Sequence, residues 1–207
     1  METDIESPGS SQVDHLGNTL DEILEWLNRS GRKELVRRLL PPVERSRLIG
    51  DMARFDLDPC ADVIAAYQWK GGTNVPAGTN LDDVQFFPGF YWLSWDDAIA
   101  NLSTFRRDRR WNPSWLPVFA NGGGDFYAVN CEGGSESLCS VVGFILDQPE
   151  QEVEYQTLGS MFATILECYR RGAFFVDSRG FLEMDDRLHA EIARAHNPKV
   201  ALWKESA

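Results

Sequence analysis

The glycine-rich segment Gly122-Gly123-Gly124-Asp125 is the part of the sequence that most suggests ligand chemistry. Glycine-rich loops bind phosphate through backbone N–H groups when they lead into a helix and carry lysine and serine or threonine at fixed spacing. This segment has no lysine nearby, and the apolar run 126–129 that follows it is typical of a strand. We therefore interpret Gly122, Gly123, Gly124 and Asp125 as a structural turn between two strands.

Neighbouring carboxylates are a second candidate for a functional site, because a pair of carboxylates can exchange protons with a substrate or bind a metal ion. Asp82-Asp83 and Asp96-Asp97 are adjacent in the sequence, which directs their side chains apart in regular structure. Asp97 also follows Ser94 by three residues, which is a helix-capping pattern. We therefore do not expect these residues to be catalytic.

The histidines and cysteines form no recognisable catalytic or metal-binding motif. His189 and His196 are seven residues apart, so even on one helix face they lie two turns apart and need other ligands to bind a metal ion. The cysteines contain no C-x-x-C pair and have no histidine at metal-ligand spacing. We expect no catalytic residues, metal site or cofactor, and thiols of a reducing compartment at Cys60, Cys131, Cys139 and Cys168.

The composition is that of a well-packed, acidic protein. Its 207 residues fit one large domain, and 43% hydrophobic and 12% aromatic residues are enough to build a core. The 32 acidic and 20 basic side chains give a net charge of −12, which argues against nucleic-acid binding and favours a basic protein partner. The N-terminus lacks a secretory pattern and no apolar run reaches the ~20 residues of a membrane span, so we expect a cytoplasmic protein without a membrane partner.

Charge is unevenly distributed along the chain. No basic residue lies between Arg110 and Arg170, whereas residues 29–54 contain eight basic and three acidic side chains. The basic region is either a docking patch or, more simply, a solvated helix face that pairs with acidic neighbours. From charge alone, we predict that a partner binds acidic residues on loops flanking the sheet: Asp82, Asp83, Glu132, Glu136, Glu150, Glu152 and Glu154.

The strands that position these loops are predicted around the glycine-rich turn. The apolar runs 115–120 and 126–129 flank the turn, and both faces of the second run are apolar, so we expect this hairpin in the middle of the sheet. An aromatic run containing Pro88 is predicted as an edge strand, because proline cannot donate to a strand ladder. The edge strand, a third core strand and a second hairpin are expected at 86–93, 138–146 and 173–184, respectively.

Helices are predicted from capping patterns and apolar spacing. The first begins at Thr19, which has Glu22 three residues later, and the acidic stretch 1–17 before it is expected to be a flexible tail. Residues 18–207 are then expected to form a single α+β domain. Further helices are expected at residues 35–40, 58–72, 94–105, 157–171 and 186–195.

Several aromatic and glycine motifs follow one another in a characteristic order. A helix ends in Tyr67-x-Trp69-x-Gly-Gly, a Leu-Ser-Trp helix start lies at 93–95, and a Trp-x-x-x-Trp-Leu-Pro-Val-Phe segment at 111–119 precedes the Gly-Gly-Asp turn. Together they resemble the SUKH superfamily, in the branch of the fungal cell-wall-assembly regulator and bacterial toxin-immunity proteins. The resemblance covers about residues 45–172 and leaves the C-terminal hairpin and helix, 173–203, outside.

The resemblance implies an α+β fold with a mostly antiparallel central sheet and helices packed around it. It also implies binding without catalysis, because many bacterial members are immunity proteins that bind and neutralise a polymorphic toxin such as a nuclease. The alternative is an intracellular regulatory scaffold, which would dock through the acidic tail and the basic region 29–54. A hydrolase or nucleotide-binding enzyme is less favoured, because it requires polar groups clustered in a pocket.

Overall fold

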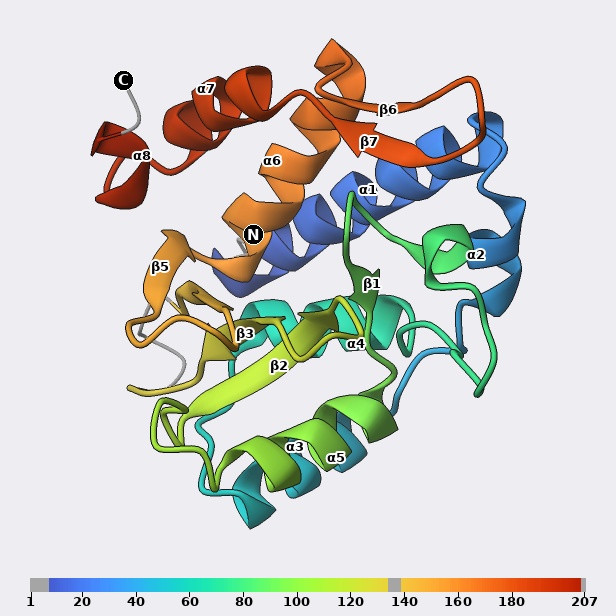
Figure 1. Ribbon diagram of the computed structural model, residues 1–207. Coiled ribbons are helices and arrows are strands. Elements are labelled where there is room, and N and C mark those ends of the chain that lie inside the picture. The colour runs from blue at the N-terminus through green and yellow to red at the C-terminus, as the bar shows by residue number, and fades with distance from the viewer. Residues whose placement is uncertain (1–7, 134–138, 206–207) are drawn as a thin grey trace, which may run out of the picture.

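The fold is built on a five-stranded antiparallel sheet, shown in the computed structural model of Figure 1. The structure describes residues 8–133 and 139–205. The strands are β1 (Tyr91–Trp92), β2 (Trp115–Ala120), β3 (Phe126–Asn130), β4 (Val141–Phe144) and β5 (Glu152–Tyr155). They lie in chain order, so each strand pairs with its sequence neighbour. With helices packed around this sheet, the predicted α+β class is confirmed.

The β2–β3 hairpin lies at the centre of the sheet, as its sequence predicted. β3 is the middle strand and has buried residues on both faces. Gly122, Gly123, Gly124 and Asp125 form the turn, and the φ values of 80° at Gly122 and 107° at Gly124 favour glycine. Asn121 closes the turn by accepting a hydrogen bond from Gly123 N (2.7 Å) and donating one to Asp125 Oδ2 (2.6 Å).

Helices cover both faces of the sheet (Figure 1). The main helices are α1 (Pro8–Arg29), α4 (Ala61–Trp69), α5 (Trp95–Phe105) and α6 (Leu158–Arg171). α5 packs on one face, and α4 and α6 pack on the other, with α1 lying against both of them. Trp92 of β1 is fully buried between these helices, where its ring stacks on Trp69 (centroids 5.9 Å apart) and meets Phe162 edge-on (6.2 Å).

Helix α1 begins at Pro8, so the prediction of a flexible tail over 1–17 is wrong for residues 8–17. Proline suits the first turn of a helix, and Leu16 is buried, which extends the apolar stripe of α1 towards its N-terminus. Thr19 lies inside the helix, where its hydroxyl donates to the carbonyl of His15 (3.0 Å) and caps nothing. Residues 1–7 lie outside the described part of the chain.

The segment before α4 also differs from the prediction. Two helices, α2 (Lys33–Arg38) and α3 (Arg45–Arg54), precede it, and α3 was not predicted. α4 begins after Cys60, so Asp58 is not its cap. The Asp58 carboxylate instead accepts a hydrogen bond from Gly133 N (3.0 Å), a contact that no local sequence pattern indicates.

The predicted caps of α5 and α6 are confirmed. Ser94 Oγ accepts a hydrogen bond from Asp97 N (3.1 Å) at the start of α5. Thr157 caps α6 through reciprocal hydrogen bonds with Ser160. Gly172, with φ of 75°, ends α6 in the left-handed region.

The C-terminal part packs against α6 (Figure 1). It consists of the predicted hairpin of β6 (Phe174–Val176) and β7 (Leu182–Met184), then α7 (Asp186–His196) and α8 (Leu202–Glu205). Asn197 is fully buried after α7, donates to Thr164 Oγ1 of α6 (3.1 Å) and accepts from Gln156 N (3.0 Å). Across the residues with described structure, no helix combines the length and apolarity needed to cross a bilayer.

Candidate functional site

Three of the predicted acidic residues lie outside the cavity described below, and a fourth falls outside the described part of the chain. Asp82 and Asp83 lie on the short 3-10 helix η1 (Leu81–Val84), where their carboxylates accept hydrogen bonds from side chains of the same turn. Glu132 is exposed just after β3, and Glu136 lies outside the described residues. The chemistry of a candidate site therefore depends on the remaining three.

Glu150, Glu152 and Glu154 line one cavity of about 360 Å³ beside β5. Glu150 belongs to the β4–β5 loop, but Glu152 and Glu154 lie on β5, so the prediction that all these residues are on loops is wrong for those two. β5 is a short edge strand with alternating acidic residues, which gives it little apolar signal. The cavity, here called the acidic pocket, is lined by Gly143, Ile145, Gln148, Pro149, Glu150, Gln151, Glu152 and Glu154.

A β-bulge directs the side chain of Glu154 into the acidic pocket. The register between β4 and β5 shifts between Val141 and Val142, which leaves Glu154 as the extra residue on β5. Its carboxylate lies over Gly143, where an added Cβ atom would be 2.0 Å from Glu154 Oε1. The absence of a side chain at Gly143 therefore creates the space that the carboxylate occupies.

The Glu154 carboxyl group titrates near neutral pH. Burial raises its pKa to about 7, a hydrogen bond from Tyr127 Oη to Oε2 (2.9 Å) opposes this rise, and the charge of Glu152 adds to it. Burial also raises the pKa of Tyr127 well above its ordinary value, so the phenol stays protonated and donates. A carboxylate in such an environment can bind a cation or exchange a proton with a bound molecule.

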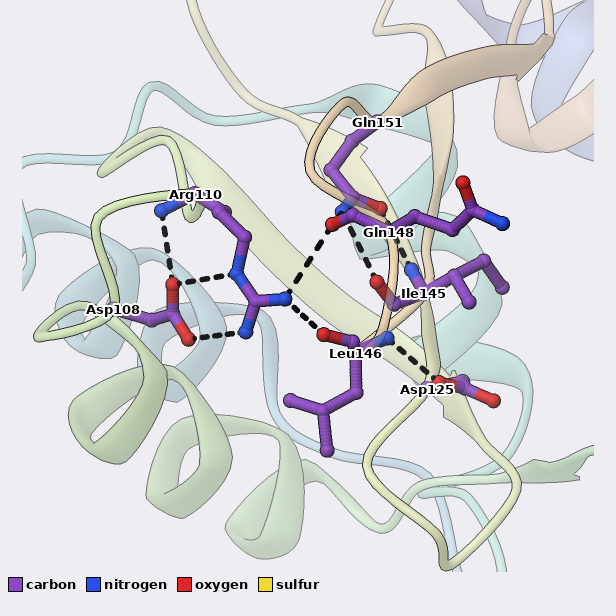
Figure 2. Close-up of polar contacts among 7 residues, drawn as sticks. All are labelled: Asp108, Arg110, Asp125, Ile145, Leu146, Gln148 and Gln151. Carbon is purple, nitrogen blue, oxygen red and sulfur yellow. Dashed lines mark hydrogen bonds and ion pairs between the residues drawn. The ribbon is translucent and has the colours of Figure 1, made fainter.

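The β4–β5 loop that borders the acidic pocket is held by its own side chains (Figure 2). Gln151 Oε1 accepts from Ile145 N (2.7 Å), and Gln151 Nε2 donates to Ile145 O (3.1 Å). The same Nε2 donates to Gln148 O (2.8 Å). These bonds satisfy backbone groups across the loop and fix its shape before any ligand binds.

Arg110 joins this loop to the segment that follows α5 (Figure 2). Its guanidinium donates to the carbonyls of Leu146 and Gln148, and it pairs with both carboxylate oxygens of Asp108. Asp125, from the glycine-rich turn, accepts a hydrogen bond from Leu146 N through Oδ1 (2.8 Å). The turn therefore also positions one border of the acidic pocket.

We expect Arg110→Gln to loosen the β4–β5 loop without unfolding the sheet. The substitution removes charge-assisted hydrogen bonds to loop carbonyls, so amide exchange at Ile145 and Leu146 should accelerate roughly tenfold. Arg109→Gln is the matched control, because Arg109 is exposed and adjacent. Unchanged exchange in Arg110→Gln, measured by hydrogen–deuterium exchange, would mean that Gln151 alone holds the loop.

A line of buried side chains connects the acidic pocket to the C-terminal helices. Tyr127, which donates to Glu154, meets the ring of Tyr155 edge-on, with centroids 5.8 Å apart. Tyr155 Oη lies 3.4 Å from Nε2 of His189 on α7. Trp203 of α8 donates its indole N–H to the carbonyl of Glu154 (2.6 Å). The C-terminal part of the chain therefore supports the pocket.

Sequence reasoning identified the carboxylates of the pocket but not the residues that support them. Arg110, Tyr127 and Gln151 act across strands or loops, so no local pattern marks them. Gly143 had a usable signal, because a glycine inside an apolar strand often marks the close approach of another group.

The basic region 29–54 has most of its charges paired with acidic neighbours. Five of its eight basic side chains form ion pairs with acidic side chains: Arg29, Arg37, Arg38, Arg47 and Arg54. These contacts favour the interpretation of a paired, solvated helix face over a docking patch. In the ranges 8–133 and 139–205, no group of three or more His, Cys, Asp and Glu side chains is arranged to hold a metal ion.

Comparison with known proteins does not assign the chain to a family. No protein-family model matches it, and a search of curated proteins finds no match. The resemblance to the SUKH superfamily therefore stays a prediction from sequence motifs, and a functional proposal has to rest chiefly on the acidic pocket.

Proposed function

We propose that the protein is a non-catalytic protein-binding module whose acidic pocket accepts a basic side chain of a partner protein. The observation that carries the proposal is the cavity itself, in which the carboxylate of Glu154 is joined by those of Glu150 and Glu152. A lysine ammonium or arginine guanidinium group would meet opposite charge there at short range. Ile145 and Pro149 line the same cavity and suit the aliphatic stem of such a side chain.

The β4–β5 loop favours binding because it is already ordered. Gln151 and Arg110 hold its backbone through the hydrogen bonds drawn in Figure 2, so little conformational entropy is lost when a ligand enters. The net charge of −12 would speed the encounter with a basic partner through long-range attraction. A charge-assisted hydrogen bond between the cation and the Glu154 carboxylate, made away from water, would then slow dissociation.

The partner we favour is a basic toxin domain, such as a nuclease. The SUKH resemblance implies an immunity protein, and an acidic pocket complements the basic cleft of an enzyme that binds nucleic acid. In this mechanism the protein covers the cleft of the toxin and performs no reaction. The alternative is that the protein is a regulatory scaffold that docks through the basic region 29–54. The paired charges of this region leave little surface for docking.

An enzymatic role would use Glu154 as a general base, since its pKa of about 7 suits that task. Catalysis would also require a nucleophile or donors that stabilise a developing negative charge. Among the described residues that line the pocket there is no Ser, Thr, Cys, His, Lys or Arg, and the Gln151 amide already donates to loop carbonyls. Binding of a cation uses the groups that are present, so we favour it.

A titration with N-acetyl-arginine amide tests the pocket directly. We expect weak binding, on the order of millimolar, with NMR shifts concentrated at Gly143 and Gln151. Glu152→Lys should abolish these shifts, whereas Glu183→Lys, a matched reversal on exposed β7, should preserve them. Shifts that are absent, or that persist in Glu152→Lys, would refute the proposed role of the pocket.

With a protein partner, such as the product of a neighbouring toxin gene, Glu154→Gln should weaken binding roughly 30-fold, equivalent to ~2 kcal/mol. The affinity of the unmodified protein should also fall as pH drops below about 7, because Glu154 then becomes protonated. Isothermal titration calorimetry at pH 6 and pH 8 measures both effects. Binding that is equal at both pH values would show that Glu154 does not contact the partner's cation.

A further inference from the structure

A second cavity, here called the aromatic hollow, lies between α5 and the glycine-rich turn. Its volume is about 230 Å³. Its lining includes three aromatic rings, one amide side chain and the backbone of the turn: Tyr91, Phe105, Phe126, Asn101, Gly122 and Gly124. Of the residues that the structure describes, none lines both the aromatic hollow and the acidic pocket, so the two are separate candidate sites.

The three rings belong to different elements that meet at this end of the sheet. Tyr91 lies on β1 and pairs with Ala120 of β2, and Phe126 begins β3. Phe105, the last residue of α5, meets Phe126 edge-on with ring centroids 4.7 Å apart. Phe126 is buried, whereas Tyr91 and Phe105 are only half-buried and can contact a ligand. Rings in such an arrangement favour an edge-to-face or offset contact with a further ring.

Two side chains of the aromatic hollow have polar atoms that the rest of the described chain does not use. Asn101 donates from Nδ2 to the carbonyl of Asp97 (2.8 Å), and its Oδ1 accepts no hydrogen bond from a described residue. The Tyr91 hydroxyl also has no hydrogen-bond partner among them. Burial raises the pKa of Tyr91, and the charge of Asp97 adds to the rise, so the hydroxyl stays protonated and can donate. The hollow therefore offers one acceptor and one hydroxyl beside its rings.

Charge and size limit the ligands that fit the aromatic hollow. None of its described lining residues is charged, so neither an anion nor a cation would meet an opposite charge there. Its volume is below the roughly 300–1,000 Å³ of pockets for drug-sized ligands, which leaves room for a single ring. A ring without polar atoms would cover the Asn101 oxygen without replacing its hydrogen bonds to water, which costs affinity. A neutral ring with a hydroxyl group avoids this cost.

We propose that the aromatic hollow binds a phenol ring, from a small molecule or from a tyrosine side chain. The ring packs against Phe105 and Phe126, and its hydroxyl donates to Asn101 Oδ1 and accepts from the Tyr91 hydroxyl. A phenol hydroxyl has one donor and two acceptor positions, so a single group satisfies both protein partners. Binding at this site is independent of the acidic pocket and of the function proposed for it.

The test is an NMR titration of the full chain with 4-methylphenol. We expect binding on the order of millimolar, with shifts concentrated at the amides of Gly122 and Gly124. Toluene, which lacks the hydroxyl, should bind at least about fivefold more weakly. Shifts that are absent, or equal affinities for the two compounds, would overturn the proposal. N-acetyl-tyrosine amide identifies the source of the ring: if it binds as well, the hollow accepts a tyrosine side chain, and if only 4-methylphenol binds, the ligand is a small phenol.

Variants test the two hydrogen bonds separately. Asn101→Leu and Tyr91→Phe should each weaken the binding of 4-methylphenol about fivefold and reduce its advantage over toluene. Ser103→Leu is the matched control for Asn101→Leu, because Ser103 is exposed on the same helix and lies outside the hollow. Glu152→Lys should leave these shifts unchanged while it abolishes those of N-acetyl-arginine amide, so a failure of either site is recognised separately. Unchanged affinity for 4-methylphenol in both Asn101→Leu and Tyr91→Phe would refute the proposed contacts.

Discussion

Glu154→Gln should stabilise the protein at pH 8 by about 3 kcal/mol more than it does at pH 4. The folded structure raises the pKa of the Glu154 carboxyl from 4.5 to about 7, chiefly through burial. Each unit of difference in pKa between the folded and unfolded states corresponds to ~1.4 kcal/mol of stability. Glutamine does not titrate, yet it keeps an oxygen that can accept the hydrogen bond from Tyr127, so the comparison isolates the charge.

The direction of this effect depends on which state holds the proton. Between about pH 4.5 and 7, the folded protein keeps a proton on Glu154 that the unfolded chain has lost. The stability contributed by this group is therefore fully present below about pH 4.5 and is lost as pH rises through about 7. Above that, the folded protein holds a charged carboxylate close to Glu152, a cost that Glu154→Gln does not have.

Urea unfolding at several pH values between 4 and 8 measures this difference. Glu183→Gln is the control, because Glu183 is exposed on β7 away from the acidic pocket. Gly143→Ala is an independent second test. Its Cβ atom would displace the Glu154 carboxylate, so the free energy of unfolding should also depend less on pH in this variant. If Glu154→Gln and the unmodified protein keep a constant stability difference across the range, the carboxyl does not titrate near neutral pH.

Acidification should destabilise the protein through His189, again by about 3 kcal/mol between pH 7 and pH 4. Burial lowers the pKa of this imidazole from 6.5 to about 4, and the charge of Asp186 only partly opposes the shift. The ring stacks on Phe174 and meets Trp203 edge-on, with centroids 5.5 Å apart in both cases, so a protonated ring would be poorly solvated. Folding therefore favours the neutral form.

The sign is opposite to that of Glu154. The stability contributed by neutral His189 is present above pH 6.5 and is lost as pH falls towards 4, because only the unfolded chain takes up the proton in this range. His189→Gln should remove this acid sensitivity, while the loss of aromatic contacts lowers stability at pH 7 by ~1 kcal/mol. His196→Gln, on the exposed end of the same helix, is the matched control.

The two groups titrate over overlapping pH ranges with opposite effects, so their contributions largely cancel in the unmodified protein. Each single variant should therefore show the pH dependence that the remaining group gives to the stability. Stability should rise with pH in Glu154→Gln and fall with pH in His189→Gln. Chemical denaturation across pH 4–8 distinguishes these slopes. If the stability of the two variants changed with pH in the same direction, Glu154 and His189 would not have opposite effects on stability.

Elements whose signals are local were predicted closely. The central hairpin followed from apolar runs around a glycine turn, and the starts of α5 and α6 followed from the caps Ser94 and Thr157. Local signals failed where tertiary contacts supply the stabilisation. The first turns of α1 have a polar composition and were assigned to a tail, although Leu16 is buried in the core. β5 was missed because its alternate residues are acidic, although β4 pairs with it.

The sequence by itself determined the α+β class, the central hairpin and the acidic character of the region after Arg110, because strand periodicity, turn chemistry and charge are properties of neighbouring residues. Only the tertiary structure decided which carboxylates act together. Glu154 obtains its raised pKa from burial over Gly143 on the adjacent strand, and its hydrogen bond comes from Tyr127. Burial, charge and hydrogen bonding act through space, so sequence spacing does not reveal them.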